Sequence, residues 1–329
     1  MRRDNTGLLT EAALRAGLRS CLVANRILTV ESGTQEPLAF ARGVPPSTRQ
    51  GGAALLEERD VARSVLAGSG IPVPMCQTFT FDAPMADVER AAAQFGAGSG
   101  VRSAWQGGPI ITPESSADVR GAVERIEGVV GTNSRRTARP QSRFMVEEPL
   151  REFDEDVVVS HGRLLGTPPG LSGPAEALAV GAIGSIPGVK VGSVRLAERI
   201  RDGALVVSSV SAVPRLRGPD RTASTRAWRL LSDEVGYFWK FEPRSPESDA
   251  LAARLEVGGV TSEGLEPGVR VETGTGSTLA VDSVQSSSAG LLMEVEGNAP
   301  AVTELMNRLI TGSLVGAVPL WVEAVVLGR

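Results

Sequence analysis

Residues 144–166 read FMVEEPLREFDEDVVVSHGRLLG, and this stretch decides the fold class. An apolar run leads into two glutamates before Pro149, and a triple valine then leads to a turn at His161 and Gly162. Short apolar and β-branched runs bounded by Pro and Gly predict strands joined by tight turns. His161 is the only histidine. We therefore expect it in a hairpin turn, and we exclude histidine-rich metal sites.

Helices and strands alternate on both sides of this stretch. Residues 10–20 and 55–67 have helical patterns, GVRSAW (100–105) is typical of a strand, and VKVGSVRL and GALVVSSVSAVP (189–196 and 203–214) predict two strands around a turn. This order predicts a fold of the α/β and α+β classes with several lobes.

A change of composition marks the best domain boundary. EPRSPESD (242–249) is a Pro, Ser and Glu linker. We expect an N-terminal segment over 1–54, a main body over 55–241 and a compact α+β domain over 250–329, whose elements follow the order βαββαβ.

Composition excludes several classes of function. The 329 residues carry a net charge of −4, which argues against a nucleic-acid partner. No apolar run approaches the roughly 20 residues of a membrane span. The only cysteines, Cys21 and Cys76, form no disulfide framework. We expect a cytoplasmic protein.

The order of motifs in the main body resembles the ATP-grasp superfamily, in particular its cyanophycin-synthetase-like branch of carboxylate–amine ligases. The resemblance rests on LLEERDVARSVLAGSGIPVP (55–74), VRSAWQGG (101–108), the opening stretch and residues 185–216. It implies that Val146 and Glu147 lie against adenine and Glu148 near the ribose. It also implies ATP and Mg²⁺, because lysines and metal ions must stabilise the charge of the transferred phosphoryl group.

The sequence departs from that family where the chemistry is done. The two phosphate-binding lysines fall at Arg59, which keeps a charge, and Ser103, which does not; the metal-binding Asp, Glu and Asn fall at Arg195, Ser209 and Ser211. Arginine cannot ligate Mg²⁺, which prefers carboxylate oxygen. The resemblance therefore implies a degenerate nucleotide and metal site without cofactor.

A rival alignment of residues 279–305 restores a metal site. It makes Asp282, Glu294 or Glu296, and Asn298 the ligands, with Arg59 or Arg102 as the phosphate clamp. Under this alternative the chain binds ATP and Mg²⁺ and forms an amide bond through an acyl phosphate.

The C-terminal segment, 252–329, resembles acylphosphatase, which has a ferredoxin-like fold. GGVTSEGLEPGVRV (258–271) resembles the phosphate-binding loop of that family. Glu266 falls at the position of its phosphate-binding arginine and Ser286 at that of its water-positioning asparagine. A negative charge at 266 would repel phosphate, so the resemblance implies a domain without activity.

Three functions follow as hypotheses. The first is a pseudoenzyme acting as a structural or regulatory subunit, which pairs with a competent ATP-grasp ligase or with itself. The second is the active ligase of the rival alignment, and the third is a small-molecule binder that uses the old cleft.

Overall fold

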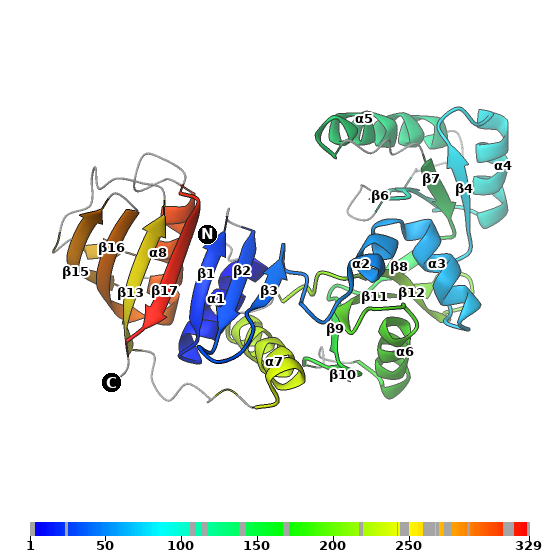
Figure 1. Cartoon of the computed structure of the whole chain (residues 1–329). Helices are drawn as coiled ribbons and strands as arrows, with labels where there is room; N and C mark the ends of the chain where they lie inside the picture. The colour runs from blue at the N-terminus through cyan, green and yellow to red at the C-terminus, as the bar shows by residue number, and fades with distance from the viewer. Residues whose placement is uncertain are drawn as a thin grey trace. The chain divides into compact units, whose positions relative to one another are not determined.

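The chain divides into two units in the computed structural model (Figure 1). Unit 1 joins Met1–Pro46 to Val213–Arg329, and unit 2 is Ser47–Ala212. The structure describes residues 4–23, 26–105, 110–112, 118–137, 143–166, 171–216, 220–241, 243, 250–258, 267, 270–272, 278–287, 290–311 and 319–327.

The first sheet of unit 2 has four described strands in the antiparallel order β4, β7, β5, β6. Two helices, α4 and α5, pack on it. The bounds are β4 Cys76–Thr80, α4 Met85–Phe95, β5 Gly100–Ser103, β6 Ile110–Ile111, α5 Val119–Thr137 and β7 Arg143–Glu147. Val101, Phe144 and Val146 are buried against these helices, and the rings of Phe79 and Phe144 stack at 5.8 Å. Since side chains alternate along a strand, the residues between them face away from α4 and α5.

The second sheet of unit 2 runs β10, β9, β11, β12, with β8 also pairing with β11. Helices α2, α3 and α6 contact this sheet. The bounds are α2 Gln50–Glu57, α3 Arg59–Gly68, β8 Leu150–Glu152, β9 Val157–Ser160, β10 Arg163–Leu164, α6 Gly173–Gly184, β11 Val191–Arg199 and β12 Leu205–Ser211. His161 lies in the turn between β9 and β10 at a positive φ of 48°, so the predicted hairpin turn is confirmed.

Unit 1 is built on one antiparallel sheet whose eight described strands follow the order β14, β15, β16, β13, β17, β1, β2, β3. Helices α8, α1 and α7 lie along one face of it (Figure 1). The bounds are α1 Asn5–Arg15, β1 Arg19–Val23, β2 Ile27–Glu31, β3 Leu38–Ala41, α7 Asp220–Trp239, β13 Ala250–Gly258, β14 Arg270–Glu272, β15 Thr278–Ser287, β16 Gly290–Asn298, α8 Ala299–Ile310 and β17 Trp321–Val326. Leu9, Leu22, Leu28, Leu255 and Leu305 are fully buried in this unit.

The C-terminal strands have the neighbours that a βαββαβ unit requires. The order β15, β16, β13, β17 is antiparallel throughout, and α8 precedes β17. The expected first helix, between β13 and β15, falls mostly on residues outside the described ranges. The ferredoxin-like, acylphosphatase-like domain therefore stays a prediction.

The division into units differs from the predicted boundaries at 54/55 and 241/250. β17 pairs with β13 on one side and with β1 on the other, so the C-terminal segment shares its sheet with the N-terminal strands. Helix α7, whose residues fall within the predicted main body of 55–241, belongs to unit 1. Hydrophobic pattern identifies strands but does not identify their neighbours.

Two predicted helices have different bounds. The helix expected over 10–20 begins at Asn5, because the side chain of Asp4 accepts a hydrogen bond from the Gly7 N–H, and it ends before Gly17, which has a φ of 71°. The helix expected over 55–67 is two helices, broken at Glu58, whose backbone is extended.

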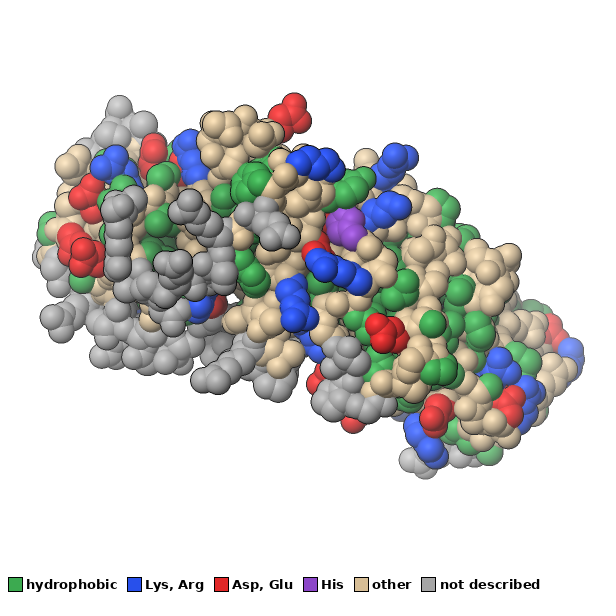
Figure 2. Space-filling view, turned by 90° about the horizontal axis from the view of Figure 1, so that it is seen from below, with side chains coloured by type: hydrophobic (Ala, Val, Ile, Leu, Met, Phe, Trp, Pro, Cys, Tyr) green, Lys and Arg blue, Asp and Glu red, His purple; other side chains and the backbone are tan. Residues whose placement is uncertain are grey.

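Charges of both signs are spread over the molecular surface. On the face drawn in Figure 2, acidic and basic side chains are both present, and neither kind covers the face. Among the described helices, none has both the length and the apolar character that crossing a membrane requires.

Candidate functional site

Unit 2 holds a network of buried and half-buried charges that we call the arginine–carboxylate network. Its members come from α3, both sheets and the loop before β9, and they are Arg63, Arg102, Glu147, Glu152, Asp156 and Arg195. Three positive and three negative groups make the network neutral as a whole.

Glu147, at the end of β7, is the centre of the network. One of its carboxylate oxygens accepts a hydrogen bond from Arg63 of α3, and the other accepts one from Arg102 of β5, both at 2.6 Å. All three side chains are 3–4% exposed. Such short, charge-assisted bonds in a dry interior fix the positions of all three groups.

The network joins the two sheets of unit 2. Arg102, from the first sheet, donates to Glu152 of the second sheet at 2.8 Å. Arg63 donates to the backbone oxygen of Ser208 on β12 at 2.9 Å, and the Ser208 hydroxyl donates to Glu152 at 3.2 Å. The space between the sheets is therefore bridged by ion pairs and hydrogen bonds.

Arg195 of β11 ends the network. Its guanidinium lies 2.5 Å from Asp156 and 3.3 Å from Glu152. Burial lowers the pKa of Arg195, but its bonds to these carboxylates raise it above the ordinary value. For the acid Glu152 the directions are reversed. Burial raises its pKa, but hydrogen bonds from Arg102 and Arg195 outweigh this and lower the pKa below the ordinary value.

Arg59 is a buried cation of unit 2 that lies outside the network. It opens α3, is only 5% exposed, and donates from Nη1 to the backbone oxygen of Ser103 at 2.7 Å. Within the described part of the chain no carboxylate pairs with it, and its Nε has no hydrogen-bond partner. Burial and the charges of Arg102 and Arg63 lower the pKa of Arg59 to about 9, which still leaves it charged at neutral pH.

Strand β5 carries a cation at Arg102, directly before Ser103, the position at which the resemblance places a phosphate-binding lysine. Val101 faces α4 and α5, so alternation places Arg102 on the opposite face and Ser103 on the same face as Val101. Ser103 is fully buried, and its hydroxyl accepts a hydrogen bond from the Trp105 N–H. A cation is therefore present beside Ser103, but it is bound to two glutamates.

The expected adenine hinge is held by protein contacts. Val146 packs in the core under α4 and α5. Glu148 is 3% exposed; its carboxylate accepts from the Met75 N–H at 2.8 Å and lies 3.4 Å from Arg199, while its own N–H donates to the Met75 oxygen. The carboxylate that the resemblance places near the ribose thus has partners within the chain.

The positions expected for metal ligands lie together on neighbouring strands. Arg195 of β11 is directly opposite Ser209 of β12, and Ser193 is opposite Ser211. The predicted pairing of these strands is confirmed. At these positions they present a guanidinium and hydroxyl groups rather than the carboxylates that Mg²⁺ prefers.

The residues of the rival metal site lie in unit 1, where two have structural partners. Asn298 caps α8 by accepting from the Ala301 N–H at 2.9 Å, and Glu294 pairs with Arg254 at 2.9 Å. Asp282 and Glu296 are exposed on β15 and β16. In the described ranges, no group of three His, Cys, Asp or Glu side chains is arranged to hold a metal ion.

The two positions assigned by the acylphosphatase resemblance are not described in side-chain detail. Glu266 lies outside the described residues. Ser286 is in β15, paired with Leu291 of β16, and its side chain lies outside the description. Gly107 and Gly108, the expected glycine loop, are outside it too.

Sequence reasoning missed Arg63, Glu152 and Asp156. The available signal was charge in apolar surroundings. Arg63 lies on the buried face of α3, between Ala62 and Leu66. Glu152 and Asp156 lie between the apolar run that ends at Leu150 and the triple valine that begins at Val157. Charged side chains at positions that a pattern predicts to be buried indicate ion pairs.

Comparison with known proteins gave structural neighbours alone. No protein-family model matches the chain, and no curated protein matches it. Similar solved structures include a RimK domain ATP-grasp protein from Sphaerobacter thermophilus, with 20% identity over 56% of this chain and 69% of that one and a TM-score of 0.40. The D-alanine–D-alanine ligase from Coxiella burnetii has 12% identity over 59% of this chain and 60% of that one, with a TM-score of 0.44.

A third neighbour is the biotin carboxylase from Campylobacter jejuni, with 13% identity over 74% of this chain and 63% of that one and a TM-score of 0.44. This chain spans less than two thirds of the length of the D-alanine–D-alanine ligase and of the biotin carboxylase. ATP-grasp ligases are thus among its structural neighbours. Likeness at these TM-scores assigns no activity.

Proposed function

We propose that this chain is a non-catalytic relative of ATP-dependent carboxylate–amine ligases and acts as a structural or regulatory subunit. The observation that carries the proposal is the pairing of Glu147 with both Arg63 and Arg102 between the two sheets of unit 2. In the ATP-grasp resemblance, this is the region that would bind the nucleotide.

The first support is the state of the cations. A phosphate-binding cation must present N–H donors to the ligand, whereas Arg102 donates to Glu147 and Glu152. Breaking a buried ion pair leaves its partner charged without compensation, which costs about 3–5 kcal/mol. Arg102 pairs with both Glu147 and Glu152, so phosphate would have to displace two carboxylates to reach its guanidinium.

The second support is the chemistry of the strand positions that would ligate Mg²⁺. Arg195 occupies one of them and repels a divalent cation, and the serines at 209 and 211 offer neutral hydroxyl groups. The nearby carboxylates Glu152 and Asp156 are bound to Arg195. Without the ion, the charge of a transferring phosphoryl group lacks the metal part of its clamp.

The proposed partner is a competent ATP-grasp ligase or a second copy of this chain. In either case the fold is retained for its surface and packing.

Calorimetric titration of the full chain with ATP, with and without Mg²⁺, tests the proposal. We expect no saturable heat at about 1 mM ATP and no rise of the unfolding midpoint, since a ligand stabilises only the state that it binds. Ser103→Lys should create no turnover, because the groups of a phosphate clamp act as a unit.

Two results would overturn the proposal. Micromolar binding that requires Mg²⁺ supports an active ligase with Asp282, Glu294 and Asn298 as relocated ligands. Saturable ATP binding without Mg²⁺ supports a small-molecule binder that uses the cleft.

A further inference from the structure

Cys76, one of the two cysteines, lies on β4, the outermost described strand of the first sheet of unit 2. Phe79 packs in the core under α4 and α5, so alternation along the strand places Cys76 on the opposite face. There it is directly opposite Glu147 of β7, on the side of the arginine–carboxylate network. Cys76 is half-buried, and its neighbours Met75 and Gln77 are exposed, so solvent reaches this end of the strand.

Beside this thiol lies a guanidinium with unused hydrogen-bond donors. The Arg63 side chain is 4% exposed, and its Nη2 atom makes the bonds to Glu147 and to the Ser208 oxygen. Its buried Nε and Nη1 atoms have no hydrogen-bond partner in the described part of the chain. Burial lowers the pKa of Arg63, but the nearby Glu147 carboxylate and Cys76 thiol raise it above its ordinary value. Because a buried donor without an acceptor is costly, these N–H groups favour an acceptor that the unmodified thiol does not supply.

The charges on this side of the sheet also favour an additional negative group. The arginine–carboxylate network is neutral, and Arg59 lies buried outside it, close enough to interact with Arg63 and Arg102. Glu147, which faces Cys76, is bound by two arginines, so its charge is compensated. An anionic oxygen added at Cys76 would therefore meet an excess of one positive charge.

Oxidation by a peroxide supplies such an oxygen. The Cys76 thiol releases its proton, and the sulfur attacks one oxygen of hydrogen peroxide; the O–O bond breaks as the S–O bond forms. The leaving hydroxide takes up the released proton to give water, and two electrons pass from sulfur to peroxide. The N–H groups of Arg63 stabilise the negative charge that develops on oxygen during this step. The product is a sulfenic acid, which is larger than the thiol by a single atom.

We propose that Cys76 is a peroxide-reactive thiol whose sulfenic acid is held by the Nε and Nη1 N–H groups of Arg63. A neutral alkyl adduct would use none of these donors, which is why the geometry favours oxidation over alkylation. Oxidation creates a contact between β4 and α3 that depends on the redox state. The proposal does not rest on the proposed function, because neither a nucleotide nor a metal ion takes part in the reaction.

Trapping with dimedone, a diketone that reacts with sulfenic acids, tests the assignment on the full chain. The reduced chain is treated with hydrogen peroxide and excess dimedone, and mass spectrometry of peptides follows the labelling of each cysteine. Cys21 is the internal control, because burial, with a contribution from Glu323, raises the pKa of its thiol to about 11. Since the thiolate is the reacting form, we expect Cys76 to be labelled at least about tenfold faster than Cys21. A sulfoxide formed at Met75 does not react with dimedone.

The same reaction on the chain unfolded in urea distinguishes activation from simple access. Unfolding exposes Cys76 fully and separates it from Arg63. We expect Cys76 to be labelled about tenfold faster in the folded chain, because the hydrogen bonds to the developing charge exist only there. A thiol that was merely half-exposed would react more slowly in the folded chain than in the unfolded one.

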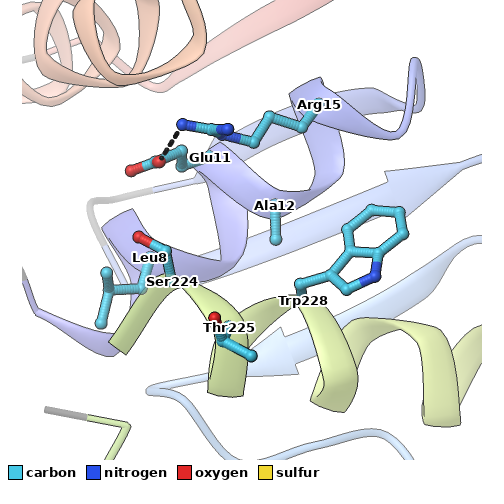
Figure 3. A pocket seen from close by; sticks show the side chains of 7 residues that line it. All are labelled: Leu8, Glu11, Ala12, Arg15, Ser224, Thr225 and Trp228. Carbon is cyan, nitrogen blue, oxygen red and sulfur yellow. Dashed lines mark ion pairs between the residues drawn. The ribbon is translucent and has the colours of Figure 1, made fainter. Parts of the chain in front are cut away.

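Two variants test the role of Arg63. Arg63→Gln should slow the labelling of Cys76 about tenfold. Arg15→Gln is the matched control: Arg15 also pairs with a glutamate, Glu11, at 3.1 Å, but it does so at a hollow between α1 and α7 of unit 1 whose lining residues include no cysteine (Figure 3). It should leave the rate unchanged. Circular dichroism and unfolding curves verify that both variants are folded.

Three outcomes would overturn the proposal. They are the absence of a dimedone adduct on Cys76, labelling of Cys76 that is no faster in the folded than in the unfolded chain, and an unchanged rate in folded Arg63→Gln. If Arg63→Gln does not fold, the comparison of the folded and unfolded states of the unaltered chain decides the question.

Discussion

At the scale of single residues, the contribution of a charged side chain to the stability of this protein depends on its burial. Glu147 holds two buried arginines, whereas Glu294 pairs with Arg254 where both side chains are more than 40% exposed. Water screens the exposed pair, and its contribution to stability is expected to be small. Removing one member of the buried group leaves charges that neither water nor a partner compensates.

We therefore predict that Glu147→Gln lowers the free energy of unfolding by about 3–5 kcal/mol, because Arg63 and Arg102 lose their shared carboxylate. Glu294→Gln, the matched control, should lower it by less than about 1 kcal/mol. Urea unfolding of both variants measures the difference. Similar losses for the two variants would mean that the network does not hold the sheets of unit 2 together.

The chemistry of these residues was only partly predictable from the sequence. Ser103 was identified as the position of the second lysine, and Arg102 was named only in the rival alignment, as a phosphate clamp. Its partners lie 45 and 50 positions further along the chain, and Arg63 is 84 positions from Glu147. An ion pair between residues so far apart depends on which sheets face each other, and local patterns do not contain that information.

At the scale of elements, local patterns predicted whether a segment is a helix or a strand better than they predicted the residues at which it begins and ends. Strands β11 and β12 were expected where they occur. The break between α2 and α3 was not, because Glu58 interrupts a pattern that continues on both sides of it. Its backbone is held by tertiary contacts: Glu58 bridges to Trp105, and the next N–H donates to the Ala104 oxygen.

The packing of α6 on β11 depends on a glycine. A Cβ atom at Gly192 would lie 2.5 Å from the backbone oxygen of Ser211 and 2.7 Å from the Cδ1 atom of Ile183. Strand β12 or helix α6 would have to move. We predict that Gly192→Ala lowers the free energy of unfolding by about 1–3 kcal/mol, the usual range for overpacking.

Gly121→Ala is the matched control for that measurement. Gly121 is in helix α5, and a Cβ atom there meets nothing within 4 Å. Alanine should raise the stability by about 0.5–1 kcal/mol through its helix propensity. Thermal unfolding of both variants shows whether each substitution raises or lowers the stability. An unchanged stability of Gly192→Ala would contradict the close approach of β12 to Gly192.

At the scale of the whole molecule, the contact-based units differ from those suggested by composition. The linker at 242–249 was the strongest boundary signal, yet the strands that follow it share a sheet with β1 through β17. Composition reports where the chain is polar. Strand pairing between distant segments is decided by complementary edges, which composition does not report.

Fragments of unit 2 test the division directly. We predict that residues 47–212 unfold cooperatively when expressed alone, because both sheets, their helices and the arginine–carboxylate network lie within that range. A fragment of residues 55–241 begins inside α2 and lacks the hydrogen bond from the Arg49 N–H to the Gly188 oxygen. It also contains α7 without the sheet on which that helix packs. That fragment should unfold at a lower urea concentration, and the reverse order would favour the composition-based boundary.

The pairing of β1 with β17 also has a consequence for biosynthesis. Arg19 and Glu323, which bond across these strands, are 304 positions apart. At about 5–20 residues per second, β1 leaves the ribosome roughly 15–60 s before its neighbour exists. Unit 2 is contiguous and can fold during that interval, whereas β1 waits with an unpaired edge. A chaperone that shields this nascent edge would therefore matter more for the yield of folded protein than for its final stability.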